Sequence, residues 1–181
     1  MNSRASQLSA AGVGLLSLAI VGSGLSGRDL TGDEIAIFTG GPLQTLNAAL
    51  NPGEHFTGHM PLSYWLRWVF LSLMGEGSVA AWRMHAALGF AGASALTVLA
   101  VGGLRWAGLA GLLVALSPIA VFHGMDSSNY AWTACLGAGA LVALRDPVRH
   151  RWWLVGCLTL AAWNDLYGVW LGAGVLVACW M

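Results

Sequence analysis

Long uncharged runs of apolar residues constrain this sequence more than any other feature. Hydrophobic residues make up 57% of its 181 residues and charged residues 9%, which is too little charge to cover the surface of a water-soluble domain. The runs are rich in glycine and alanine and longer than the ~10-residue alternating strands of a membrane barrel. The sequence therefore predicts an all-α, multi-pass integral membrane protein, with one membrane domain over residues 1–181.

Five or six of these apolar segments are expected to cross the bilayer. The first, residues 8–25, is uncharged and just long enough for a hydrocarbon core ~30 Å thick. It exceeds the usual length of the apolar part of a signal peptide, the alternative for this segment, and only Arg4 precedes it, so we expect an uncleaved helix. The further segments are residues 79–101, 107–122, 130–144 and 152–181, the last of them either a helical hairpin or one long helix.

A polar segment, residues 28–76, follows the first span and is expected to form a long outer loop with interfacial helices. Residues 60–74 within it are mostly apolar, and Pro61 near their start suits the first turn of a helix. A helix of ~15 residues is too short to span a bilayer, so this one is expected to lie in the membrane interface. Its aromatic anchors would be Tyr64, Trp65 and Trp68.

The distribution of arginine predicts the orientation of the spans. With the N-terminus in the cytoplasm, five of the eight arginines lie inside and seven of the eight acidic residues lie outside, as the positive-inside rule requires. The inner arginines are then Arg4, Arg105, Arg145, Arg149 and Arg151. The expected location is a bacterial inner membrane. The net charge is zero and no basic run exists that would hold nucleic acid.

Two acidic residues, Asp33 and Glu34, come shortly after the first span on the predicted outer side. Adjacent carboxylates at a membrane surface are suited to general-base catalysis or to holding a metal ion or a phosphate group. The alternative is a solvated turn in which Asp33 caps a short helix. The pattern alone leaves both readings open.

Two histidines in the same outer segment, His55 and His59, suggest a metal site. Histidines four residues apart on a helix can share a divalent ion, and the third ligand would be Glu34, or else Asp33 or Asp126. Thr57-Gly58 between them instead favours a loop, in which case they are ordinary loop histidines. A divalent metal is therefore one of two expectations for this segment.

Other polar residues lie near the predicted outer ends of the spans. An ionisable residue such as Arg83 must there face protein, water or a lipid headgroup, and snorkelling is the alternative. Asp126 and Tyr130 belong to the link between two spans, and Asn164-Asp165 interrupts the last apolar segment. By the predicted topology all of these point to the same face as Asp33.

Five stretches together resemble the N-terminal membrane module of the GT-C glycosyltransferases, closest to the protein O-mannosyltransferases and the lipid A aminoarabinose transferases. They are Gly32-Asp33-Glu34, the His-Met-Pro-Leu-Ser-Tyr-Trp run at residues 59–65, Gly75-Glu76-Gly77-Ser78, the Ala-Trp-Arg-Met-His-Ala-Ala run at residues 81–87, and Ser117-Pro118 through Tyr130. Their order, spacing and topology agree with the family over nearly the whole chain.

This resemblance implies an enzyme that transfers a sugar from a polyprenyl-phosphate donor to an acceptor on the outer side of the membrane. Asp33 would be the general base, with Glu34 as a second catalytic carboxylate. The residues implied for binding the lipid phosphate or the acceptor are His59, Arg67, Arg83, Asp126 and Tyr130.

Two departures from the family pattern keep other functions open. Ser128 stands where the family has an arginine that would bind phosphate. Family members also continue for several more spans, so we expect this chain to be the N-terminal part of a longer architecture. The alternative is a non-catalytic membrane subunit of a larger complex. A small transporter, the third hypothesis, would need charge buried within a span, and only Asp165 qualifies.

Overall fold

The computed structural model describes residues 3–27, 29, 61–74, 79–102, 106–126 and 129–180. Over these ranges the chain is helical and contains no strand, which confirms the predicted all-α class. The helices are α1 (Ser3–Gly22), α4 (Pro61–Met74), α5 (Val79–Val101), α6 (Ala107–Ala115), α7 (Pro118–Met125), α8 (Tyr130–Ala143), α9 (Arg151–Asn164) and α10 (Leu166–Trp180).

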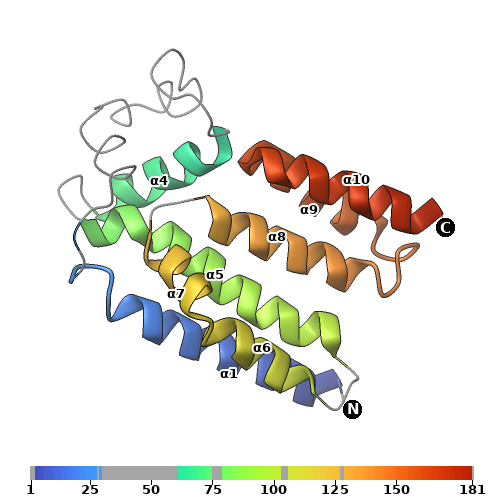
Figure 1. Ribbon diagram of the computed structural model, residues 1–181, viewed down its shortest axis with the longest axis horizontal. Coiled ribbons are helices and arrows are strands. Elements are labelled where there is room, and N and C mark those ends of the chain that lie inside the picture. The colour runs from blue at the N-terminus through green and yellow to red at the C-terminus, as the bar shows by residue number, and fades with distance from the viewer. Residues whose placement is uncertain are drawn as a thin grey trace.

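The central helix is α5, which packs against α1, α4, α6, α7 and α8. On the other side of α8 lies α9, and α10 packs against α9. Figure 1 shows α1, α5 and α8 running side by side, with α9 and α10 beyond α8 and α4 near the start of α5. Glycine allows the closest approaches: a Cβ at Gly111 of α6 would meet the Ser94 carbonyl oxygen of α5 at 3.0 Å and Val13 of α1 at 3.2 Å.

The bundle has two ends, which we name after the arginine found at each. At the Arg83 end, Nη1 of Arg83 donates to the carbonyl of Leu25, just after α1, at 2.9 Å. At the Arg145 end, Nη1 of Arg145 donates to the carbonyl of Leu99, near the end of α5, at 2.8 Å. Since α1 ends at the Arg83 end, its N-terminus lies at the Arg145 end (Figure 1). Four of the five arginines predicted to share one side of the membrane therefore lie at the Arg145 end: Arg4, Arg145, Arg149 and Arg151. The fifth, Arg105, lies outside the described residues.

Among the residues that the structure describes, two helices are long and apolar enough to cross a membrane, Arg4–Gly22 and Val79–Val101. The α6–α7 pair becomes a third if it is counted as one broken span. These lengths support a membrane protein, and they do not confirm the expected five or six spans. The side of the membrane that each end faces stays a prediction.

The apolar segment expected as one uninterrupted span over residues 107–122 is bent by 58° between α6 and α7. Ser117 has an extended backbone with ψ of 120°, and Pro118 opens α7. Proline has no N–H to donate into the helix, and its ring forces the preceding residue out of the helical region. The Ser-Pro pair therefore ends α6, which the apolar pattern alone does not predict.

Of the two alternatives for residues 152–181, the structure has the helical hairpin. Asp165 is extended, with φ of −157° and ψ of 151°, and it separates α9 from α10. The turn is tight because Gly168 of α10 lies directly against the backbone of Ala161 in α9: a Cβ on Gly168 would overlap the Ala161 carbonyl group.

Gly168→Ala is therefore expected to destabilise the protein by about 1–3 kcal/mol, the usual cost of forcing an extra group into a packed site. Thermal unfolding of the purified protein in detergent measures the change. The matched control is Gly172→Ala in the same helix, where a Cβ would meet nothing within 4 Å. Equal unfolding temperatures for the two variants would contradict the close α9–α10 contact.

Two of the three cysteines, Cys135 and Cys157, occupy packing positions beside glycines. Sγ of Cys135 lies 2.7 Å from the place of a Cβ on Gly92, and Sγ of Cys157 lies 2.9 Å from that of Gly139. Both thiols are free. These two cysteines fill the space that a missing side chain leaves between neighbouring helices.

Candidate functional site

Half of the site residues predicted from the sequence lie in the described part of the chain. The described ones are Arg67, Arg83, Asp126 and Tyr130. The predicted catalytic pair, Asp33 and Glu34, and the predicted metal ligands His55 and His59 lie outside the described residues, so their roles stay predictions.

Arg83 is fully buried in the first turns of α5, with 0% of its surface exposed. Its Nη1 donates to the Leu25 carbonyl at 2.9 Å, and its Nη2 donates to the Asp29 carbonyl at 3.0 Å. Both carbonyls belong to the segment after α1, which ends at Gly22, so no α1 hydrogen bond pairs them and Arg83 supplies the donor that each needs. Arg83 therefore joins the segment after α1 to the start of α5 and faces protein, one of the environments expected for it. Its implied role in binding a lipid phosphate stays a prediction.

Arg67 is also fully buried, on α4. Its guanidinium carbon lies 5.3 Å from the centroid of the Tyr64 ring, one helical turn earlier, an arrangement typical of a cation–π contact. Burial raises the pKa of the Tyr64 phenol, and the positive charge of Arg67 opposes this shift. Tyr64 packs with Trp82 of α5, so α4 is joined to α5 through side chains inside the protein.

His85 is a third buried polar residue at this end, and the sequence does not single it out as a site residue. Its Nδ1 lies 2.8 Å from the Trp82 carbonyl. A carbonyl only accepts, so Nδ1 carries the proton in this contact. Arg67, Arg83 and His85 thus place three basic side chains inside the Arg83 end of the bundle.

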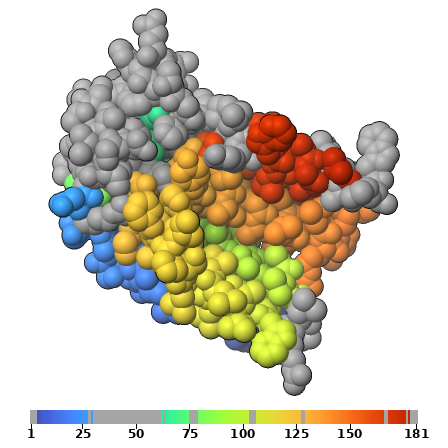
Figure 2. All heavy atoms as spheres, in the orientation of Figure 1, coloured from blue at the N-terminus to red at the C-terminus, as the bar shows by residue number. Residues whose placement is uncertain are grey.

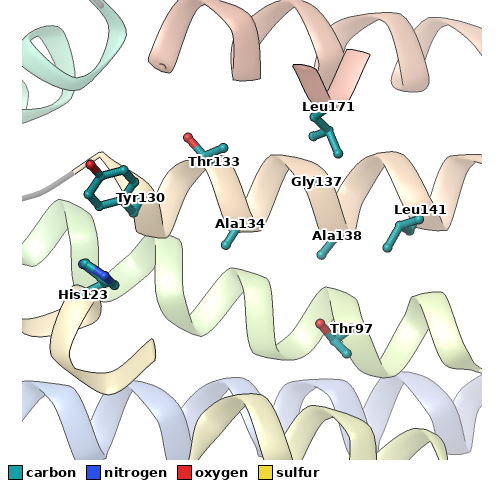
Figure 3. A pocket seen from close by; sticks show the side chains of 9 residues that line it. All are labelled: Thr97, His123, Tyr130, Thr133, Ala134, Gly137, Ala138, Leu141 and Leu171. Atoms are coloured by element: carbon teal, nitrogen blue, oxygen red, sulfur yellow. The ribbon is translucent and has the colours of Figure 1, made fainter. Parts of the chain in front are cut away.

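A groove of about 730 Å³ runs along α8. Its walls include Ala134, Ala138 and Leu141 of α8 and Leu171 of α10, and Thr97 of α5 lies across from them (Figure 3). Figure 2 shows this face of the molecule, with α5 in green between α6–α7 in yellow and α8 in orange. The lining is apolar over most of its length.

At the Arg83 end of the groove, His123 of α7 and Tyr130 of α8 lie with their ring centroids 5.0 Å apart. Thr133 lies near this end, whereas Thr97 lies opposite Ala138 (Figure 3). From Tyr130 to Leu141 the groove follows α8 over about 16 Å, at a helical rise of ~1.5 Å per residue. The groove is therefore amphipathic along its axis. Its length and composition suit a molecule with a polar head and an apolar chain.

Two asparagines, Asn129 just before α8 and Asn164 at the end of α9, form a buried junction between the two helices. Nδ2 of Asn129 donates to the Asn164 carbonyl at 3.0 Å, and Nδ2 of Asn164 donates to the Asn129 carbonyl at 2.7 Å. Asn164 also donates to Oγ1 of Thr133, a groove residue, at 3.0 Å. The junction fixes the start of α8, and with it the polar end of the groove.

Comparisons of the chain with protein-family models, curated proteins and solved structures found no match. The resemblance to GT-C glycosyltransferases therefore rests on the sequence motifs alone. Within the described ranges no group of three or more His, Cys, Asp or Glu side chains forms a metal site. The predicted ligands Glu34, His55 and His59 are outside those ranges, and the metal also stays a prediction.

Proposed function

We propose that this chain is a membrane glycosyltransferase module that uses a polyprenyl-phosphate sugar as its donor. The observation that carries the proposal is the groove along α8, apolar over most of its length and polar where His123 and Tyr130 meet. The polyprenyl chain would lie against Ala134 and Ala138, and the phosphate and the sugar would lie at the Arg83 end. The groove supports only the binding of such a lipid, and the sugar-transfer reaction is proposed from the sequence motifs that resemble the GT-C family.

The proposed reaction is a displacement at the anomeric carbon of the sugar. Asp33 takes the proton from the acceptor hydroxyl or amine, whose oxygen or nitrogen then bonds to the anomeric carbon. The bond from that carbon to the phosphate oxygen breaks, and the phosphate leaves on its lipid with both electrons. Cations near the leaving phosphate favour this step. Among the described residues, the candidate cations are Arg67 and Arg83. Both side chains are fully buried, so they contact a phosphate only if the Arg83 end opens.

The assignment of the groove as the lipid-binding site is tested by a substitution that fills it with a bulky side chain. Ala134→Trp is expected to weaken the binding of a short polyprenyl phosphate by about tenfold or more, a loss of ~1.4 kcal/mol or more of binding free energy. Titration of the purified protein in detergent, followed by native mass spectrometry, measures the affinity. Leu136→Trp places the same bulky side chain on α8 outside the groove lining and is expected to bind like the wild type. Equal affinity in both variants would exclude this groove as the lipid site.

A second candidate is a non-catalytic subunit that keeps the fold within a larger membrane complex. The observation in its favour is that Arg83 holds the backbone carbonyls of Leu25 and Asp29, which gives this arginine a structural role without any phosphate. Ser128, in place of the family's arginine, agrees with the same reading. Co-purification of the chain with a stable assembly, together with no sugar transfer, would favour this candidate.

A further inference from the structure

A turn at the Arg145 end concentrates positive charge far from the polar end of the groove. The Arg149 turn, residues 144–151, joins α8 to α9 and holds three arginines and one acidic residue, Asp146. Oδ1 of Asp146 accepts the backbone N–H of Arg149 at 3.2 Å, and the Asp146 carbonyl accepts the N–H of His150 at 3.0 Å. Asp146 thus helps to shape the backbone of the turn. With His150 neutral, the turn has a net charge of plus two.

Large apolar side chains are exposed beside this charge. Trp152 is 75% exposed, and the guanidinium carbon of Arg151 lies 5.5 Å from the centroid of its ring. Val148 is 83% exposed. The neighbouring Trp153 is held by a hydrogen bond from its Nε1 to the Gly139 carbonyl at 3.1 Å. Tryptophan next to arginine is typical of the boundary between lipid headgroups and acyl chains.

We propose that the Arg149 turn binds the headgroup of an anionic phospholipid in the leaflet that the Arg145 end faces. Arg149 and Arg151 are both exposed, and a guanidinium group can pair with a phosphate through two parallel hydrogen bonds. Trp152 lies at the level of the glycerol backbone. Arg145 anchors the site, because its Nη1 donates to the Leu99 carbonyl and so holds the end of α8 against α5. The site is independent of sugar transfer.

The test uses the purified wild-type chain in detergent, titrated with dihexanoyl-phosphatidylglycerol, dihexanoyl-phosphatidylcholine or inorganic phosphate. Native mass spectrometry counts the bound lipid. We expect saturable binding of phosphatidylglycerol, weakened by added salt, and much weaker binding of the other two probes. Removal of one surface arginine is expected to cost about fivefold in affinity, and the double variant Arg149→Gln/Arg151→Gln about thirtyfold.

Two further variants separate a built site from a general attraction between charges. Arg149→Lys/Arg151→Lys keeps the charge but lacks the guanidinium fork, so it is expected to bind phosphatidylglycerol more weakly than the wild type and more tightly than the double Gln variant. Arg4→Gln removes an exposed arginine of α1 at the same end and is expected to leave the affinity unchanged. Equal binding of phosphatidylcholine or of inorganic phosphate, or an equal loss in Arg4→Gln, would overturn the proposal. The comparison of probes needs no variant, so misfolding of a mutant cannot hide the result.

Discussion

The variant Asp33→Asn is expected to transfer sugar from a polyprenyl-phosphate donor ~10²–10⁴ times more slowly than the wild type, the usual loss when a general base is removed. The amide has nearly the shape of the carboxylate but cannot take up the proton of the acceptor. Binding of the lipid donor and the thermal stability are expected to stay the same, since the substitution keeps the size and shape of the side chain. Initial rates with a labelled donor at saturating acceptor measure the effect.

The control for this prediction is Asp29→Asn, which makes the same chemical change four residues earlier. The Asp29 side chain is exposed, and its contact with Arg83 uses the backbone carbonyl, which the substitution keeps. We expect this variant to transfer sugar at the wild-type rate. If Asp33→Asn is as active as Asp29→Asn, Asp33 is not the base, and the resemblance fails at its most important residue.

The second large effect is expected for Arg83→Met, which should destabilise the protein by about 2–4 kcal/mol. The change removes two charge-assisted hydrogen bonds, to the carbonyls of Leu25 and Asp29, each worth ~1.5–3 kcal/mol. Part of this loss is offset because the protein no longer buries a charge. Arg83→Lys is expected to lie in between, because one ammonium group lacks the fork geometry that reaches two carbonyls. Thermal unfolding in detergent measures all three proteins.

Thermal unfolding, combined with titration of the same variants with a short polyprenyl phosphate, distinguishes a structural role of Arg83 from a role in binding phosphate. Arg4→Met removes an exposed arginine of α1 and is expected to be as stable as the wild type. A structural Arg83 predicts a large loss of stability for Arg83→Met and normal lipid-phosphate affinity in the protein that remains folded. The opposite result, normal stability with lost affinity, would make Arg83 a phosphate ligand and would contradict its structural role.

Much of the helical framework can be predicted from the apolar runs. The expected spans over residues 79–101 and 130–144 correspond to α5 and α8, and the short helix expected over residues 60–74 to α4. A run of apolar residues does not, however, indicate where a helix bends. The break at Ser117-Pro118 depends on the missing N–H of proline, and the separation of α9 from α10 depends on the extended backbone of Asp165.

The candidate site is harder to predict from the sequence than the helices are, because its contacts join residues far apart in the chain. Arg83 bonds to Leu25, 58 residues away, and Asn129 to Asn164, 35 residues away. The sequence marks Arg83 as costly in a membrane but does not identify the carbonyls that satisfy it. Similarly, it includes Tyr130 among the candidates, whereas the groove that brings Tyr130 to His123 arises only when α7, α8 and α10 pack together.

The most direct test of the proposed function is sugar transfer by the wild-type chain itself. The purified protein is placed in liposomes with a labelled polyprenyl-phosphate sugar or, separately, with a labelled nucleotide sugar, and product formation on added membrane acceptors is followed. We predict transfer from the lipid-linked donor and none from the nucleotide sugar. Binding of the lipid without any transfer, by a chain that co-purifies with a larger assembly, would contradict the enzyme and favour the subunit.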